Sequence, residues 1–151
     1  MPIRNSAKAV IIKDGSVLLT KNQHEDVLFY LFPGGGQEHG ETLEDALKRE
    51  CIEEIGQKIM IGELLHIREY IGKNHEHASY DKDIHQVEFF FACKLASPQK
   101  NHGQPTRPDD YQVGVEWIPL TELKTIPVYP KKLGAILTNT EKSPFYLGDI
   151  N

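Results

Sequence analysis

The chain has 151 residues, of which 39% are hydrophobic and 26% charged, and its formal net charge at pH 7 is -5. No stretch approaches the roughly 20 consecutive apolar residues that a membrane-spanning helix requires. An acidic balance argues against broad binding to nucleic-acid polymers, which normally uses a basic face. A small nucleotide substrate stays open, because bound metal ions can offset the charge of its phosphates.

The length predicts a single domain over residues 1–151, large enough to bury about 68–70% of the surface that the unfolded chain exposes. The first residues lack the apolar segment and the small-residue cleavage site of a secretory signal, so we expect a cytoplasmic protein. The two cysteines, Cys51 and Cys93, each lie among apolar residues and form no paired ligand motif. This placement predicts buried, reduced thiols.

The first third of the chain is predicted to contain a hairpin, a third short strand and a helix. Apolar runs predict strands at residues 8–12, 17–19 and 28–31. The Asp14-Gly15 pair between the first two runs is typical of a tight hairpin turn. Residues 34–40 are expected to form a loop, after which a helix of about four turns begins. Thr42 and Asp45 predict a capping box at its start, and Gly56 suits the left-handed position that ends many helices.

The rest of the chain alternates strand-like runs with polar segments. Strands are expected at 58–62, 64–70, 85–95 and around 113–118, and helices at 121–123 and from 130 to about 137. The polar segments 72–83 and 97–110 lack periodicity and are predicted to be loops. Strands around a central helix, with a further helix near the end, indicate an α/β (α+β) fold in which a sheet is flanked by helices. The pattern alone does not determine the topology.

The predicted central helix carries three carboxylates near its C-terminal end: Glu50, Glu53 and Glu54. At about 100° per residue, Glu50 and Glu54 project into the sector of the apolar Leu43 and Leu47. Carboxylates at a helix C-terminus oppose its dipole at roughly 0.3–1 kcal/mol each. Like charges one turn apart repel by about 3 kcal/mol at an effective dielectric constant near 20. A divalent cation would offset this charge, and an oxygen-only ligand set suits Mg²⁺ or Mn²⁺ better than Zn²⁺.

The same segment resembles the Nudix box, a glycine followed after five residues by a glutamate and, after seven more, by Arg-Glu-apolar-x-Glu-Glu-x-Gly-apolar. The matching positions are Gly35, Glu41, Arg49, Glu50, Cys51, Glu53, Glu54 and Gly56. The last apolar position holds Gln57, which departs from the motif. We expect this departure to affect the packing of the strand after the helix more than the chemistry.

The resemblance implies a mixed β-sheet sandwiched between helices, with the box forming a loop–helix–loop motif. It also implies hydrolysis of a nucleoside diphosphate linked to another moiety, by attack of water at phosphorus. The implied cofactor is Mg²⁺, with Mn²⁺ as an alternative, held by the carboxylates of Glu50, Glu53 and Glu54 and by the backbone carbonyl of Gly34. Arg49 is expected to orient Glu50 through a charge-assisted hydrogen bond.

The resemblance does not determine the general base, because family members use either a glutamate of the box or a carboxylate on a distant strand or loop. Glu50 is the candidate within the box. Glu41 is expected either to help place a ligand or the water, or to stabilise the helix start. Outside the box, Glu88 lies in an apolar strand and faces either solvent or the cleft. Glu116 and the acidic residues of the 72–83 loop are the remaining candidates.

The substrate stays open at this point among nucleoside triphosphates, ADP-ribose or nucleotide sugars, and dinucleoside polyphosphates. The loops at 72–83 and 97–110 are expected to recognise the part of the substrate outside its diphosphate. We expect neither a nucleic-acid polymer nor a membrane as a partner, and the resemblance allows a homodimer. The alternative function is a nucleotide-sensing domain that keeps the fold without hydrolysis. The complete set of box carboxylates favours hydrolysis over that alternative.

Overall fold

The computed structural model describes residues 1–97, 104–138 and 143–151. Its strands are β1 (Arg4–Lys13), β2 (Ser16–His24), β3 (Val27–Leu31), β4 (Gly34–Gly36), β5 (Ile59–Ile71), β6 (His85–Leu95), β7 (Gln112–Pro119), β8 (Val128–Tyr129) and β9 (Tyr146–Asp149). Its helices are α1 (Leu43–Ile55), α2 (Ala78–Asp81) and α3 (Lys131–Thr138), with 3₁₀ turns at Gly72–Asn74 and Leu120–Glu122.

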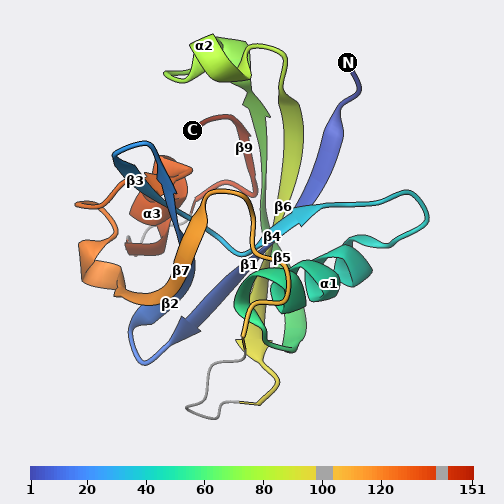
Figure 1. Cartoon of the computed structure of the whole chain (residues 1–151), viewed down its shortest axis with the longest axis vertical. Helices are drawn as coiled ribbons and strands as arrows, with labels where there is room; N and C mark the ends of the chain where they lie inside the picture. Colours follow the sequence, from blue (N-terminus) through green and yellow to red (C-terminus); the bar gives the residue numbers. More distant parts are fainter. Residues whose placement is uncertain (98–103, 139–142) are drawn as a thin grey trace.

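The strands form a mixed sheet in the order β8-β3-β2-β1-β6-β5-β9, and β4 and β7 pair with β1 and β2 off this path. The helices α1 and α3 lie on different sides of these strands (Figure 1). Each helix packs against its own hydrophobic cluster, with Leu47 of α1 in one and Leu133 of α3 in the other. The predicted fold, a mixed sheet between helices, is confirmed.

The predicted hairpin joins β1 to β2. Asp14 and Gly15 have φ angles of 51° and 77°, and Lys13 pairs directly with Ser16 across the turn. Two successive residues with positive φ form the turn whose twist matches that of the flanking strands, and Asp-Gly is a favoured sequence for it. The hairpin places β2 where it also pairs with β3 and β7.

The centre of the sheet is the parallel pair β1 and β6, which runs from Arg4 opposite Gln86 to Ile11 opposite Cys93. Side chains alternate between the two faces of a strand. Residues 7, 9 and 11 of β1 therefore face α1, whereas Val10 faces the cluster that contains α3. This alternation gives the chain two cores, one on each face of the same strands.

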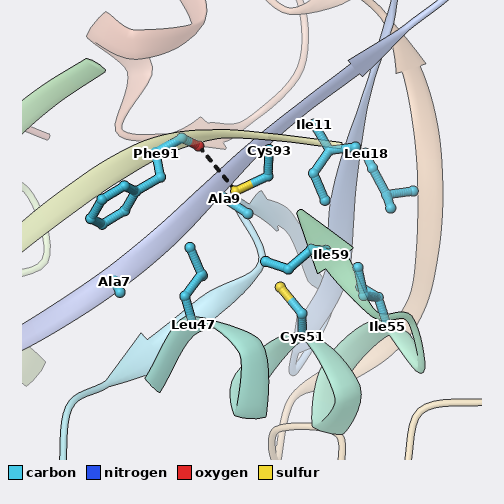
Figure 2. Packing of buried hydrophobic residues seen from close by; sticks show 10 residues of the cluster. All are labelled: Ala7, Ala9, Ile11, Leu18, Leu47, Cys51, Ile55, Ile59, Phe91 and Cys93. Atoms are coloured by element: carbon cyan, nitrogen blue, oxygen red, sulfur yellow. Dashed lines mark hydrogen bonds between the residues drawn. The ribbon is translucent and has the colours of Figure 1, made fainter. Parts of the chain in front are cut away.

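The helix α1 covers the first of these cores. Figure 2 shows its buried side chains pointing from the helix toward β1, β5 and β6: Leu47, Cys51 and Ile55. Cys51 and Cys93 are free and buried, and burial raises the pKa of both thiols, that of Cys93 to about 12. The prediction of buried, reduced thiols is confirmed.

The structure departs from the predicted elements where pairing depends on distant residues. Residues 34–36, expected in a loop, form β4 against β1, and 146–149 form the unpredicted β9 beside β5. The two strands expected at 58–62 and 64–70 are one strand, β5, with register shifts on either side of Leu64. The 72–83 segment, expected to be a loop, contains the four-residue α2.

The other predicted elements are present. The helix expected from residue 130 is α3, and the short helix expected at 121–123 is a 3₁₀ turn that begins one residue earlier. Residues 98–103 of the predicted 97–110 loop lie outside the described residues. No helix within the described ranges is long and apolar enough to cross a membrane.

Candidate active site

The glycine turn before α1 depends on residues without side chains. Gly34 has a φ of +134°, and a Cβ added there would lie 2.0 Å from the carbonyl oxygen of Ala7. This position therefore admits only glycine. A Cβ on Gly35 would lie 2.6 Å from the carboxyl carbon of Glu50. The missing side chain of Gly35 lets that carboxylate lie directly against the turn.

Both predicted ends of α1 are confirmed. The Thr42 hydroxyl accepts a hydrogen bond from the Asp45 N–H at 3.0 Å, which satisfies one of the free donors of the first turn. Gly56 has a φ of 64°, and its N–H donates to the carbonyl of Ile52. These two ends fix the helix against β4 and β1, and so fix the direction of its carboxylates.

Arg49 connects the acidic residues of the box. Its guanidinium donates two hydrogen bonds to Glu41, at 2.8 and 2.9 Å, and one to the carbonyl of Gly36 at 3.0 Å. Its Nη1 also donates to Glu50 at 3.0 Å and to Glu53 at 3.3 Å. The hydrogen bonds from Arg49 lower the pKa of Glu41 to about 2. Bidentate pairing fixes the plane of a carboxylate, so Glu41 holds Arg49 in place for the other two glutamates.

Glu54 is the most deeply buried carboxylate of the box, with 3% of its surface exposed. One oxygen accepts the N–H of Gly34 at 2.8 Å. Burial raises its pKa to about 9, although the positive charge of Lys8 opposes this effect. The Lys8 ammonium donates to the carbonyl of Gly34 at 3.2 Å. Lys8 was missed from the sequence because it lies inside an apolar run.

The segment before β7 brings a further carboxylate to these glutamates. The Arg107 N–H donates to a carbonyl of the last turn of α1 at 2.9 Å, and the Gln112 side-chain amide donates to the carbonyl of Glu54 at 2.7 Å. Asp109, between these two anchors, lies close enough for its charge to raise the pKa of both Glu50 and Glu54, beyond the larger effect of burial. From the sequence, this segment was expected only to contact the part of the substrate outside its diphosphate. The two adjacent aspartates, 109 and 110, could have indicated a functional residue in this segment. Their neighbours in the sequence, however, give no sign that they lie near the Nudix box.

The donor set suits a hard divalent cation, because it consists of carboxylate and carbonyl oxygens. A carboxylate with a pKa near 9 lies beside two others in this site, and positive charge is what such a group lacks. The oxygens are nevertheless directed elsewhere: those of Glu50 and Glu53 toward Arg49, and one of Glu54 toward the glycine turn. Within the described residues no three acidic, histidine or cysteine side chains converge on one point. Ion binding therefore requires rotation of these side chains.

Comparison with known proteins agrees with this geometry. A family model described as the NUDIX domain matches residues 2–137. The chain belongs to the Nudix family. A CTP pyrophosphohydrolase of Escherichia coli K12 is 34% identical over 110 residues, which cover 68% of this chain and 82% of that protein. A nucleoside triphosphatase of E. coli O139:H28, NudI, is 38% identical over 58 residues, which cover 36% of this chain and 41% of that protein.

The fold agrees as well. A solved Nudix hydrolase from Nitrosomonas europaea superimposes with a TM-score of 0.71 at 21% identity, covering 91% of this chain and 88% of that one. The chain is thus a Nudix hydrolase, and the hydrolases of this family act on small nucleotide substrates and generally use divalent metal ions.

Glu88, the candidate base outside the Nudix box, is buried on β6 in an ion pair. The guanidinium of Arg68 donates to its carboxylate at 2.5 Å and to the carbonyl of Ile150 at 2.7 Å. Burial alone would raise the pKa of Glu88, but the charges of Arg68, Lys8 and Arg4 outweigh it and hold the pKa below its usual value. Glu88 therefore faces neither bulk solvent nor the hydrogen-bond network of Arg49, and its role as a base stays a prediction.

The other candidate bases are engaged at the surface. Glu116 pairs with Lys21 at 3.2 Å, with both side chains partly exposed. Asp81 of α2 accepts the hydroxyl of Tyr70 at 2.7 Å, and Glu76 accepts from the side chain of Asn151 at 3.0 Å. The structure thus groups Glu41, Arg49, Glu50, Glu53 and Glu54 at the glycine turn with Lys8 and Asp109, and places these other carboxylates outside that group.

Proposed function

We propose that this Nudix hydrolase is a Mg²⁺-dependent pyrophosphohydrolase that converts a nucleoside triphosphate and water to a nucleoside monophosphate and pyrophosphate. The observation that carries the proposal is the buried Glu54 carboxylate beside Glu50 and Asp109, with Arg49 shared among three glutamates. Such a cluster needs positive charge, and a triphosphate arrives with Mg²⁺ already bound to its oxygens.

The residues that would hold the cation are Glu50, Glu53 and Glu54, together with the Gly34 carbonyl. Bound there, it would neutralise charge on the phosphates and lower the pKa of a coordinated water. Lys8 already donates to the Gly34 carbonyl, so its ammonium places a second positive charge where the phosphates would lie.

The attacking water would lose its proton to a carboxylate at the mouth of the site. We favour Glu50, because burial raises its pKa above the usual value and a raised pKa makes a carboxylate a better proton acceptor near neutral pH. Arg49 would hold that carboxylate in one orientation through its Nη1 hydrogen bond. The water oxygen would form the new bond to phosphorus as the bond from that phosphorus to the bridging oxygen breaks, and pyrophosphate would leave.

The choice of a triphosphate rests on the relatives. One is named a CTP pyrophosphohydrolase and another a nucleoside triphosphatase. Cytidine triphosphate is therefore the first substrate to test, ahead of ADP-ribose and dinucleoside polyphosphates. We further propose one domain over residues 1–151 and a cytoplasmic location, with no partner beyond the nucleotide required for the chemistry.

The decisive experiment separates and identifies the products that the purified protein forms with Mg²⁺ or Mn²⁺. The panel contains CTP, dCTP and the other nucleoside triphosphates, with ADP-ribose, nucleotide sugars and dinucleoside polyphosphates as competing classes. We expect pyrophosphate and a monophosphate from at least one triphosphate, and no product in EDTA. Preference for ADP-ribose would overturn the substrate class. No turnover of any compound would favour a nucleotide-sensing domain.

A pair of variants on α1 tests the metal assignment. Glu53→Gln removes a proposed ligand charge but keeps the size of the side chain, so we expect kcat to fall on the order of 100-fold. Glu44→Gln changes an exposed carboxylate of the same helix and should leave kcat unchanged. Thermal unfolding of both variants establishes that the fold is intact. Wild-type turnover by Glu53→Gln would remove Glu53 from the site.

A further inference from the structure

A cavity of about 460 Å³ lies beside the C-terminal end of α1, between β2, β7 and the segment that precedes β7. Its walls are mainly apolar and come from Leu18, Ile55, Pro105, Pro108, Val113 and Val115. No charged side chain is among the described residues that line it. Its volume falls in the range of small-molecule sites, about 300–1,000 Å³.

Three glutamines line this cavity, and two of them, Gln57 and Gln112, each have one buried polar atom without a partner among the described residues. Gln57 is 92% buried, with 8% of its surface exposed, and its Nε2 has no hydrogen-bond acceptor within the described part of the chain. The Oε1 of Gln112 likewise has no donor there, although its Nε2 is bound to the carbonyl of Glu54. A buried polar group left unpaired costs about 1–3 kcal/mol. The residues of the cavity wall therefore include one unpaired donor and one unpaired acceptor, both covered in this structure, so a ligand would reach them after rotation of the two amides.

Gln57 is also the residue that departs from the Nudix box, where the motif has an apolar side chain. We expected the change to affect strand packing, and the structure in addition leaves the Nε2 of this buried side chain without a partner among the described residues. An apolar side chain would avoid this cost. A glutamine at this position is therefore accounted for by an interaction that the described residues do not supply.

We propose that this cavity binds a neutral, planar heterocycle whose edge carries adjacent hydrogen-bond donor and acceptor groups, as the edge of a nucleobase does. The Gln57 amide would donate to the ring acceptor, and the Gln112 carbonyl would accept from the ring donor. The prolines and valines would contact the two apolar faces of the ring. A phosphate is a poor occupant because no cationic side chain is among the described residues of the walls. A single water, which takes about 30 Å³ in the liquid, fills little of the space.

The proposed site is separate from the carboxylates but mechanically joined to them. Pro108, in its wall, precedes Asp109, and Gln112 holds the last turn of α1 through the carbonyl of Glu54. A nucleoside has no phosphate with which to enter the acidic site. Binding of a nucleoside at the cavity therefore does not depend on the proposed hydrolysis and can be measured without Mg²⁺.

The test is a titration of ¹⁵N-labelled protein with cytidine and with uridine, in EDTA, observed at the side-chain amides of Gln57 and Gln112. Loss of each signal in Gln57→Leu and Gln112→Leu assigns it, and ribose serves as the control ligand. We expect saturable shifts of both amides, and at least tenfold weaker binding in Gln57→Leu, which restores an apolar residue to the motif. Shifts that persist unchanged in Gln57→Leu would overturn the proposal, as would amides that do not move up to the solubility limit of either nucleoside.

Two further measurements separate this proposal from its alternatives. Contacts between nucleobase protons and the methyl groups of Val113 and Val115, seen as intermolecular nuclear Overhauser effects in the wild type, would place the ring in the cavity without any variant. Their absence at saturation would place the ligand elsewhere. The Glu53→Gln protein should bind the nucleoside like the wild type, and loss of binding there would show that the nucleoside occupies the acidic site instead.

Discussion

At the scale of single residues, this Nudix site is a problem of charge distribution. Arg49 contacts Glu41, Glu50 and Glu53 but leaves Glu54 to the glycine turn and Lys8. Two cationic side chains therefore face four box glutamates, and the segment before β7 adds Asp109. This excess of negative charge is the physical reason for expecting a cation.

Asp109 offers a direct test of that reasoning. Removing its charge with Asp109→Asn should lower kcat with a triphosphate on the order of 10–100-fold, because a carboxylate beside proposed metal ligands helps position them or the water. Asp110→Asn is the matched control, since the neighbouring side chain is also exposed and is not among the groups that shift the pKa of Glu50 and Glu54. Steady-state kinetics at saturating Mg²⁺ measures the difference. Equal kcat values for the two variants would show that Asp109 has no role in catalysis.

At the scale of elements, α1 is held at both ends and along one face. Its N-terminal cap, its left-handed C-terminal glycine and its buried apolar side determine which side of the helix carries the carboxylates. The segment before β7 and the first residue of β7 add hydrogen bonds to the last turn, those of Arg107 to Glu53 and of Gln112 to Glu54. The helix thus supports both the acidic site on one side and the apolar cavity at its end.

The cap of α1 should contribute to stability more than to chemistry. Thr42→Ala removes the acceptor of the Asp45 N–H and should lower the free energy of unfolding by about 1 kcal/mol, whereas Thr42→Ser keeps the hydroxyl and should stay near the wild type. Urea denaturation at neutral pH gives both values. A kcat reduced tenfold in Thr42→Ala would contradict the separation, since it would show that the cap also controls the carboxylates.

At the scale of the whole molecule, the C-terminal segment forms the edge of the sheet beside β5. The strand β9 pairs with β5, and Arg68 joins Glu88 of β6 to the carbonyl of Ile150. Asp149 accepts from the backbone of Ile71 and lies 2.6 Å from the ring of His75. A buried charge pair thus connects two central strands to the C-terminal segment.

This pair predicts a pH dependence of stability. The pKa of Glu88 is lower in the folded than in the unfolded chain, so the unfolded state binds the proton more readily. The stabilisation is then complete above the unfolded value near 4.5 and is lost as pH falls through the lower folded value. Glu88→Gln leaves Arg68 buried without its partner and should cost about 3–5 kcal/mol at pH 7.

Urea denaturation of the wild type and of Glu88→Gln at pH 7 and at pH 3–4 checks this expectation. The gap between the two proteins should narrow at the lower pH, because Glu88 becomes protonated in the unfolded wild-type chain there and the stabilisation by its charge decreases. Glu116→Gln, which alters a partly exposed pair with Lys21, should stay close to the wild type in stability at either pH, because solvent screens such pairs. A gap for Glu88→Gln that stays constant with pH would show that packing and not charge stabilises this position.

Much of the fold follows from local chemistry in the sequence. The Asp14-Gly15 turn, the caps at Thr42 and Gly56, and the apolar periodicity of α1 are decided by residues within a few positions of one another, so they could be predicted. The spacing of the box glutamates belongs to the same class, because one helix carries them all. The buried thiols follow from their apolar neighbours.

Only the tertiary structure decided which residues from distant parts of the chain lie next to the helix and its glutamates. The short strand β4, the strand β9 and the approach of Asp109 and Lys8 to Glu54 arise from pairing between segments tens of residues apart, and no local periodicity records such pairing. The sequence showed that Gln57 departs from the motif. It did not show that the Nε2 of this residue lacks a partner among the described residues, or that a cavity lies beside it. The sequence alone determined the helix and the glutamates it carries, because those are local, whereas long-range packing decided which partners surround them.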